Sequence, residues 1–258
     1  MNRRESVLRV GLVFPELLGT YGDRGNAIVL VQRARWRGLP AELVEVSASE
    51  PIPGSLDVYL LGGGEDDPQL MASAGLRASG PALQHAVGAG AVMLAVCAGL
   101  QLVGHRYAAG DGTVLDGLGL VDLETRASPT RLIGELVVDA AAPLPRLTGF
   151  ENHSGRTTLG PGVAPLGRVV AGGGNGDGSG ADGIRAGGVY GTYMHGPVLP
   201  RNPALADHLL ALALGLDGAD SLAPLDAELE TRLRAERLQA GTTRGLRRWS
   251  QQRLLARG

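Results

Sequence analysis

The sequence predicts an α/β fold of three layers, in which helices cover both faces of a mostly parallel central sheet. Apolar segments of strand length alternate with segments of helix length through the first half of the chain. The strand segments are apolar at most positions, as is typical of parallel strands buried on both faces. With 258 residues, of which 44% are hydrophobic, the chain is long enough to bury one substantial core.

The expected elements follow one another in the order that parallel βα units require. Strands are expected at residues 7–14, 43–46, 57–61 and 91–96, and helices at residues 26–37, 68–87 and 98–107. After Asp111 the candidate strands are shorter and their loops are rich in Gly and Pro, which predicts more antiparallel pairing within one continuous sheet. These later strands are residues 132–138, 167–170 and 189–193, and a helix over residues 203–214 closes the fold.

The chain is expected to divide into a catalytic domain over residues 1–215 and a C-terminal tail, helical or partly disordered, over residues 216–258. Within the tail, residues 225–239 are amphipathic and charged, and residues 244–257 are basic. Such a tail could dock on a partner or on the surface of its own domain, or it could remain solvated.

Composition excludes several classes of function. The formal net charge of -2 gives no electrostatic reason to expect nucleic acid or an anionic membrane as a partner. All 24 basic residues are Arg, so neither a P-loop lysine nor Schiff-base chemistry is available. The Gly-rich segment 172–183 lacks a following amphipathic helix and any basic residue before Arg185, which favours a flexible surface hairpin over a phosphate-binding loop.

The single cysteine and the apolar segments bear on location. One cysteine can form neither an internal disulfide nor a thiolate zinc site, and no apolar run reaches membrane-spanning length. The first residues also lack the features of a signal peptide. A cytoplasmic protein without an integral membrane segment is therefore expected, and Cys97 needs an explanation of its own.

Cys97 stands between an apolar strand and a helix. The small residues Ala98 and Gly99 permit a sharp turn, so the segment has the pattern of a nucleophile elbow. The helix dipole would favour the thiolate, and the Ala98 amide would point toward a developing oxyanion. A lone cysteine is more often an inert buried residue, so the assignment depends on two further segments.

These two segments also follow strands. Three glycines follow the strand at residues 57–61, and the amide of Gly63 or Gly64 offers a second oxyanion donor. Residues 191–197 deliver His195 into a Gly-Pro turn, where an imidazole can act as a general base. Of the other four histidines only His153 is a rival base, because the rest fall within expected helices.

The Gly-rich turn, the elbow and the late histidine together resemble the class I glutamine amidotransferases, over residues 7–214. Ala95 stands where the elbow usually has Gly, and Pro197 stands where a Glu usually follows the histidine by two residues, as in the cobyric acid synthase-like branch. Three strings within that branch are similar to the GatD subunits of lipid II isoglutaminyl synthase. They are residues 20–26 (TYGDRGN), 149–157 (GFENHSGRT) and 191–197 (GTYMHGP).

The resemblance implies a class I glutamine amidotransferase-like fold and hydrolysis of L-glutamine to glutamate and ammonia through a thioester on Cys97, with His195 as base. It also implies Arg131 and Gln101 as substrate-binding residues. A guanidinium group suits the α-carboxylate of glutamine, because its N–H groups can meet both carboxylate oxygens.

The resemblance further implies a partner. GatD subunits pair, as a heterodimer, with a MurT-like ATP-dependent Mur ligase, and the pair amidates the α-carboxyl of D-glutamate in lipid II, a peptidoglycan precursor, to D-isoglutamine. ATP and Mg²⁺ are then expected on the partner, with no cofactor or metal in this chain. The chain would act on a membrane-bound lipid precursor only through that ligase.

The orienting acid of the expected triad is left open, because Pro197 cannot fix the tautomer of the imidazole. Glu151 and Asp23 are the candidates in this chain, but no spacing argument places either beside His195, so a carboxylate from the partner is favoured. The alternatives to this function are the glutaminase of a cobalamin-pathway amidase, a cysteine hydrolase on the same fold, and a non-catalytic scaffold subunit. An intact Cys97 and His195 count against the scaffold.

Overall fold

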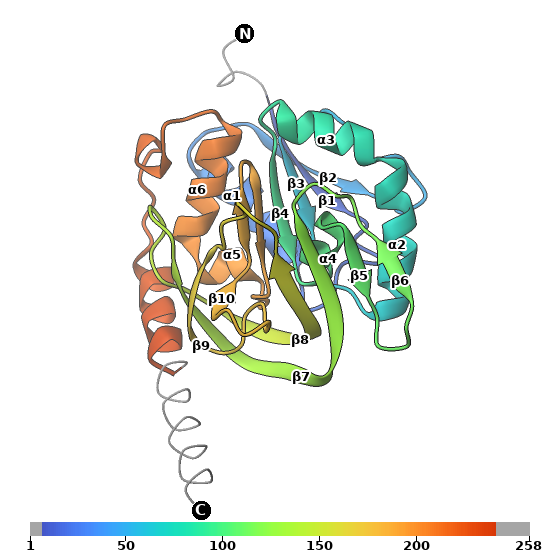
Figure 1. Ribbon diagram of the computed structural model, residues 1–258. Coiled ribbons are helices and arrows are strands. Elements are labelled where there is room, and N and C mark those ends of the chain that lie inside the picture. Colours follow the sequence, from blue (N-terminus) through green and yellow to red (C-terminus); the bar gives the residue numbers. More distant parts are fainter. Residues whose placement is uncertain (1–6, 241–258) are drawn as a thin grey trace, which may run out of the picture.

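A computed structural model describes residues 7–240 and contains the expected parallel sheet (Figure 1). Its strand order is β11-β12-β4-β3-β1-β2, and all neighbours are parallel except β11 and β12. The strands are β1 (Leu8–Val13), β2 (Ala41–Val46), β3 (Val58–Leu61), β4 (Val92–Val96), β11 (Ile184–Ala186) and β12 (Val189–Thr192). Every residue of β3, β4 and β12 is buried, as the continuous apolar runs predicted.

Helices cover both faces of this sheet, which confirms the predicted α/β class (Figure 1). One face carries α1 (Arg24–Trp36), α5 (Val198–Arg201) and α6 (Pro203–Ala213), which contact one another. The opposite face carries α2 (Asp66–Ala78) and α3 (Gly80–Gly88). The short helix α4 (Ala98–Val103) begins directly after Cys97 and contacts strands of both sheets.

A second six-stranded sheet lies beside the first, so the expectation of one continuous sheet was wrong. Its order is β10-β9-β7-β5-β6, and β8 pairs with β7. The strands are β5 (Arg106–Ala108), β6 (Val114–Asp116), β7 (Leu123–Ala140), β8 (Leu147–Leu159), β9 (Gly167–Ala171) and β10 (Ala181–Asp182). The long antiparallel β7–β8 pair satisfies its own backbone groups, so it does not need to extend the first sheet.

Two expected helices end early in the structure. The segment 68–87 is divided between α2 and α3 at Ser79, because Pro81 lacks an amide hydrogen and begins a new helix instead of continuing the first. The segment 98–107 is helical only to Val103. Gly104 is extended, and the residues that follow enter β5.

The Gly-rich segment 172–183 leads from β9 into β10, which pair antiparallel, so the expected hairpin is present, and hydrogen bonds anchor it at both ends. The carboxylate of Glu151 accepts hydrogen bonds from the amides of Gly173 and Gly174 at 2.7 and 2.9 Å. Asn175 is fully buried and accepts a hydrogen bond from the Gly183 amide at 2.7 Å. Gly172 and the tip of the segment, residues 177–180, are exposed.

The described part of the C-terminal tail docks on its own domain. The guanidinium of Arg37 donates to the carbonyl oxygen of Ala223 at 2.7 Å, and Arg33 lies 3.7 Å from Glu230 in a helical stretch, residues 228–240. The basic segment 244–257 lies outside the described residues, and the division of the chain at residue 215 stays a prediction. Within residues 7–240, no helix has both the length and the apolar character needed to span a membrane.

Candidate active site

Cys97 occupies a strained turn at the carboxyl end of β4. Its backbone has φ 52° and ψ −105°, a region that residues other than glycine rarely adopt. The Cys97 amide donates to the carbonyl oxygen of Thr192 at 2.9 Å, and the Cys97 carbonyl accepts the first helical bond, from Gln101, at 3.0 Å. A Cβ on Gly99 would lie 2.5 Å from the carbonyl oxygen of Leu61, so the tight turn requires glycine there. This is the geometry expected of a nucleophile elbow.

His195 is delivered to the same edge of the sheet by β12. Its backbone pairs with Phe150 of β8 through two hydrogen bonds of 2.8 and 3.0 Å, which fixes the turn that follows β12. The imidazole is fully buried, and its Nδ1 lies 3.5 Å from Oδ2 of Asp23, which is also buried. Thus Asp23, one of the two candidate acids in this chain, is beside His195, where a carboxylate from a partner had been favoured.

The charged form of His195 is stabilised by its neighbours. Burial opposes the imidazolium, but the neighbouring Asp23 and Cys97 side chains outweigh the burial and raise the pKa of His195 to about 10. An imidazolium beside the Cys97 side chain can give its proton to a departing amine, as acyl transfer from an amide requires.

The other candidates, Glu151 and His153, have different partners. The oxygens of Glu151 are engaged by the Gly-rich segment, and one of them lies 3.7 Å from Nε2 of His153. The His153 ring stacks on Tyr193 with a centroid distance of 3.7 Å. Burial lowers the pKa of His153, which favours the neutral ring. His153 lines the same cavity as Cys97, but the Cys97 side chain raises the pKa of His195 and not that of His153.

Two of the three expected oxyanion donors keep their amides available. Gly63 donates its N–H to Oδ2 of Asp23 at 2.7 Å, so this amide holds the carboxylate and is not directed at a substrate. Gly64 lines the cavity, and Ala98 begins the helix after Cys97. The amide of Gly99 donates to the Gly62 carbonyl at 3.1 Å and thereby ties the elbow to the glycine turn.

The TYGDRGN segment clasps the turn that contains His195. Besides placing Asp23, it brings Gly25 so close to the turn that an added Cβ would lie 2.5 Å from Cγ of Pro197. The side chain of Asn26 accepts a hydrogen bond from the Leu199 amide at 2.9 Å. Residues 20–26 were singled out by their family resemblance, and these contacts show that they hold the turn that contains His195 in place.

Both expected substrate-binding residues line the cavity that contains Cys97. Gln101 is buried and accepts a hydrogen bond from Gln69 at 2.8 Å. Arg131 reaches the cavity from β7 and donates from Nε to the side chain of Asn152 at 2.5 Å. Sequence reasoning missed Gln69 and Asn152, although Asn152 lies within one of the strings singled out.

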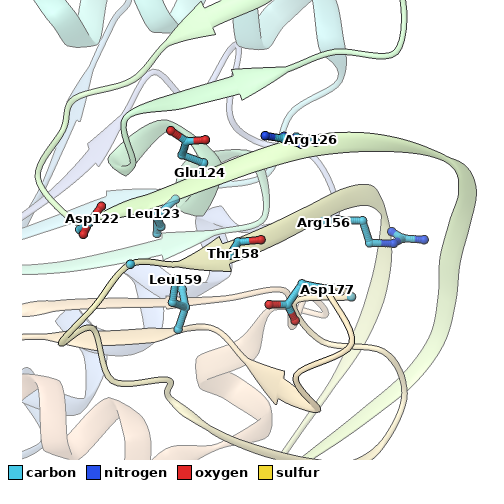
Figure 2. Close-up of a pocket in the computed structure, with 10 residues that line it drawn as sticks. Asp122, Leu123, Glu124, Arg126, Arg156, Thr158, Leu159 and Asp177 are labelled. Carbon is cyan, nitrogen blue, oxygen red and sulfur yellow. The ribbon is translucent and has the colours of Figure 1, made fainter.

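A second cavity, of about 610 Å³, lies between β7, β8 and the Gly-rich segment (Figure 2). Charged side chains from these elements surround it, among them Asp122, Glu124, Arg126, Arg156 and Asp177. The guanidinium of Arg156 donates to backbone oxygens of Thr130, Ser154 and Gly155, so its N–H groups are committed to the hairpin. No cysteine or histidine lines this cavity, so it offers no pair of nucleophile and base like the one at the elbow.

Comparison with known proteins agrees with this arrangement. A family profile described as the CobB/CobQ-like glutamine amidotransferase domain matches residues 9–203. The chain belongs to this family. Among CobB/CobQ-like relatives, the lipid II isoglutaminyl synthase (glutamine-hydrolyzing) subunit GatD of Staphylococcus aureus (strain N315) is 36% identical over 222 residues, which cover 86% of this chain and 90% of the relative. The GatD subunit of Streptococcus pneumoniae (strain ATCC BAA-255 / R6) is 34% identical and covers 80% of each chain.

Other members of the CobB/CobQ-like family match less completely. Cobyric acid synthase of Sphingopyxis alaskensis is 32% identical over 73% of this chain but only 38% of its own length. The resemblance to GatD subunits is confirmed over 90% and 80% of the lengths of the two GatD relatives. Two solved structures share the fold with a TM-score of 0.53, a glutamine amidotransferase at 19% identity and PurLQS from Thermotoga maritima at 15%. They cover 79% and 81% of this chain, and it covers 98% and 96% of theirs.

Proposed function

We propose that this chain is the glutamine-hydrolysing subunit of a lipid II isoglutaminyl synthase. The observation that carries the proposal is the buried series Cys97, His195 and Asp23 at the carboxyl edge of a parallel sheet. Relatives that match this chain over most of their length carry that name. Glutamine is the proposed substrate, and glutamate and ammonia are the products.

The reaction begins with attack of the Cys97 thiolate on the side-chain carbonyl carbon of glutamine. The amides of Ala98 and Gly64 stabilise the oxyanion, and the His195 imidazolium donates its proton as the C–N bond breaks and ammonia departs. A water molecule then gives a proton to the neutral imidazole and attacks the thioester, which releases glutamate and the thiolate. Asp23 holds the imidazole in the required orientation throughout.

Substrate recognition rests on two side chains of the cavity. The Arg131 guanidinium is proposed to hold the α-carboxylate, and Gln101 is proposed to contact the substrate beside the elbow. Gln69 fixes the orientation of the Gln101 amide through a 2.8 Å hydrogen bond.

The ammonia is proposed to pass to a MurT-like ATP-dependent ligase, in a heterodimer that amidates the D-glutamate α-carboxyl of lipid II. The GatD relatives are named as one subunit of a synthase, which supports the existence of a second subunit. The cytoplasmic location stays a prediction. A cobalamin-pathway role is less well supported, because the chain spans only 38% of the cobyric acid synthase that it matches.

Two measurements test this proposal together: glutamine turnover by the purified chain, and affinity capture of the proteins that form a stable complex with it. Purified chain, alone and with a co-expressed Mur-ligase-like protein, should release glutamate from glutamine, and a glutamine-mimicking diazoketone should alkylate Cys97. Cys97→Ser should abolish both while the protein remains folded, because a hydroxyl is far less ionised than a thiol near neutral pH. Turnover retained in Cys97→Ser would reject the nucleophile, and a stable complex without any such ligase would reject the peptidoglycan role.

A further inference from the structure

The cavity around Cys97 is too small for glutamine in this structure. Its volume is about 30 Å³, which accommodates only one or two water molecules. The Cys97 side chain is correspondingly buried, and the residue is 7% exposed. A side chain at the rim must move before a substrate of ten non-hydrogen atoms can reach the thiol.

Tyr21 is the rim residue that covers His195. Its ring lies 4.7 Å from the imidazole ring, between centroids, and Tyr21 is 40% exposed whereas His195 is fully buried. Tyr21 also has φ 61°, a left-handed conformation that is costly for an aromatic residue unless its surroundings hold it there. Contacts around Tyr21, including those of its side chain, must therefore hold its backbone in this conformation.

Those contacts lead to the proposed substrate-binding arginine. The Asn152 amide nitrogen donates to the hydroxyl of Tyr21 at 2.5 Å, and the Asn152 amide oxygen accepts from Nε of Arg131 at 2.5 Å. Asn152 is on β8, two residues from Phe150, whose backbone pairs with His195. Two consecutive hydrogen bonds thus connect Arg131, through Asn152, to Tyr21, whose ring covers His195.

We propose that Tyr21 and Asn152 form a latch on the glutamine site, closed through Arg131 and released when a substrate carboxylate engages that guanidinium. Carboxylate binding competes with Asn152 for the arginine, which loosens Asn152 and allows the Tyr21 ring to leave the cavity. The inference rests on the proposed function in assigning Arg131 to the α-carboxylate. It adds two residues that control access to Cys97.

The test measures the alkylation rate of Cys97 by iodoacetamide, a small reagent without a carboxylate, across a range of pH. Tyr21→Phe and Asn152→Ala should each raise the plateau rate about two- to tenfold, as expected when one hydrogen bond of the closed state is lost. The double variant should react no faster than Asn152→Ala, because both changes break the same link. Arg131→Ala should also speed alkylation, although it weakens glutamine binding.

Tyr190→Phe is the matched control. This variant removes the hydrogen bond between the Tyr190 hydroxyl and His208 of α6, which is 2.8 Å long. It should leave the alkylation rate unchanged. Equal rates in wild type, Tyr21→Phe and Asn152→Ala would overturn the latch. A shifted pH midpoint at an unchanged plateau would also overturn it, since that indicates altered ionisation and not altered access. If glutamine is not hydrolysed at all, the proposed function fails, whereas the alkylation rates still decide whether the latch exists.

Discussion

Nδ1 of His195 lies 3.5 Å from the carboxylate of Asp23, and the Gly63 amide holds the same carboxylate oxygen at 2.7 Å. This chain therefore places a carboxylate beside the imidazole, where Pro197 cannot supply one, on the loop between β1 and α1. Gly63, which was expected as an oxyanion donor, instead donates its N–H to this carboxylate. If Asp23 is the orienting acid, the triad needs no carboxylate from a partner subunit.

The tight contact between Gly25 and Pro197 gives a first prediction. Gly25→Ala should lower kcat for glutamine, because the new methyl group displaces the turn that holds His195. An alanine in a helix ordinarily adds about 0.5–1 kcal/mol of stability relative to glycine. Gly88→Ala in α3 is the control, because nothing lies within 4 Å of its added Cβ, and it should stabilise the protein at unchanged turnover. Equal kcat in the two variants would show that the close contact between Gly25 and Pro197 is not needed for turnover.

Asp182 should make stability depend on pH. Burial raises the pKa of Asp182 from 3.8 to about 7, against hydrogen bonds from the Thr192 hydroxyl and the Tyr193 amide. The folded state then holds a proton that the unfolded chain releases near its ordinary pKa, so the free energy of unfolding falls as pH rises between these two values.

Urea unfolding of wild type and Asp182→Asn measures this effect. The stability of wild type relative to Asp182→Asn should fall from about pH 4 to about pH 7 and then level off, because asparagine has no proton to lose. A difference that is constant across this range would show that Asp182 is ionised throughout.

Arg131→Ala should raise KM for glutamine about ten- to a hundredfold with a smaller effect on kcat, because a charge-assisted hydrogen bond to a carboxylate is worth about 1.5–3 kcal/mol. Arg131→Lys should recover only part of the loss, since a lysine ammonium cannot reproduce the planar fork. Steady-state kinetics of the three proteins test this. An unchanged KM in Arg131→Ala would show that Arg131 does not bind the substrate.

Sequence patterns predicted the elements of the site better than the contacts between them. Cys97 and His195 could be found because each follows a buried strand and enters a turn of small residues, and both signals are local. The Asp23–His195 contact could not be found, because it depends on the strand order that places the loop after β1 beside the end of β12. Spacing along the chain does not specify that order.

The second sheet was missed for a related reason. In β7, buried and exposed residues alternate irregularly and the register with β8 shifts after Ala127, so only residues 132–138 had a strand pattern. The early end of α4 was also difficult to predict. It depends on Gly104 packing against Leu123 of β7, where an added Cβ would lie 2.2 Å from the leucine side chain.

The most direct test is the glutaminase kcat of Asp23→Asn, measured on the isolated chain and on the complex with the proposed MurT-like ligase. Asparagine keeps an oxygen for the Gly63 amide but cannot favour the imidazolium or its correct tautomer. Asp122→Asn, which neutralises an exposed carboxylate 3.2 Å from the His105 ring, is the control and should retain wild-type turnover. If Asp23 orients His195, kcat of Asp23→Asn falls about 10³- to 10⁴-fold in both settings. Turnover within a few fold of wild type in either setting would contradict a triad contained within this chain.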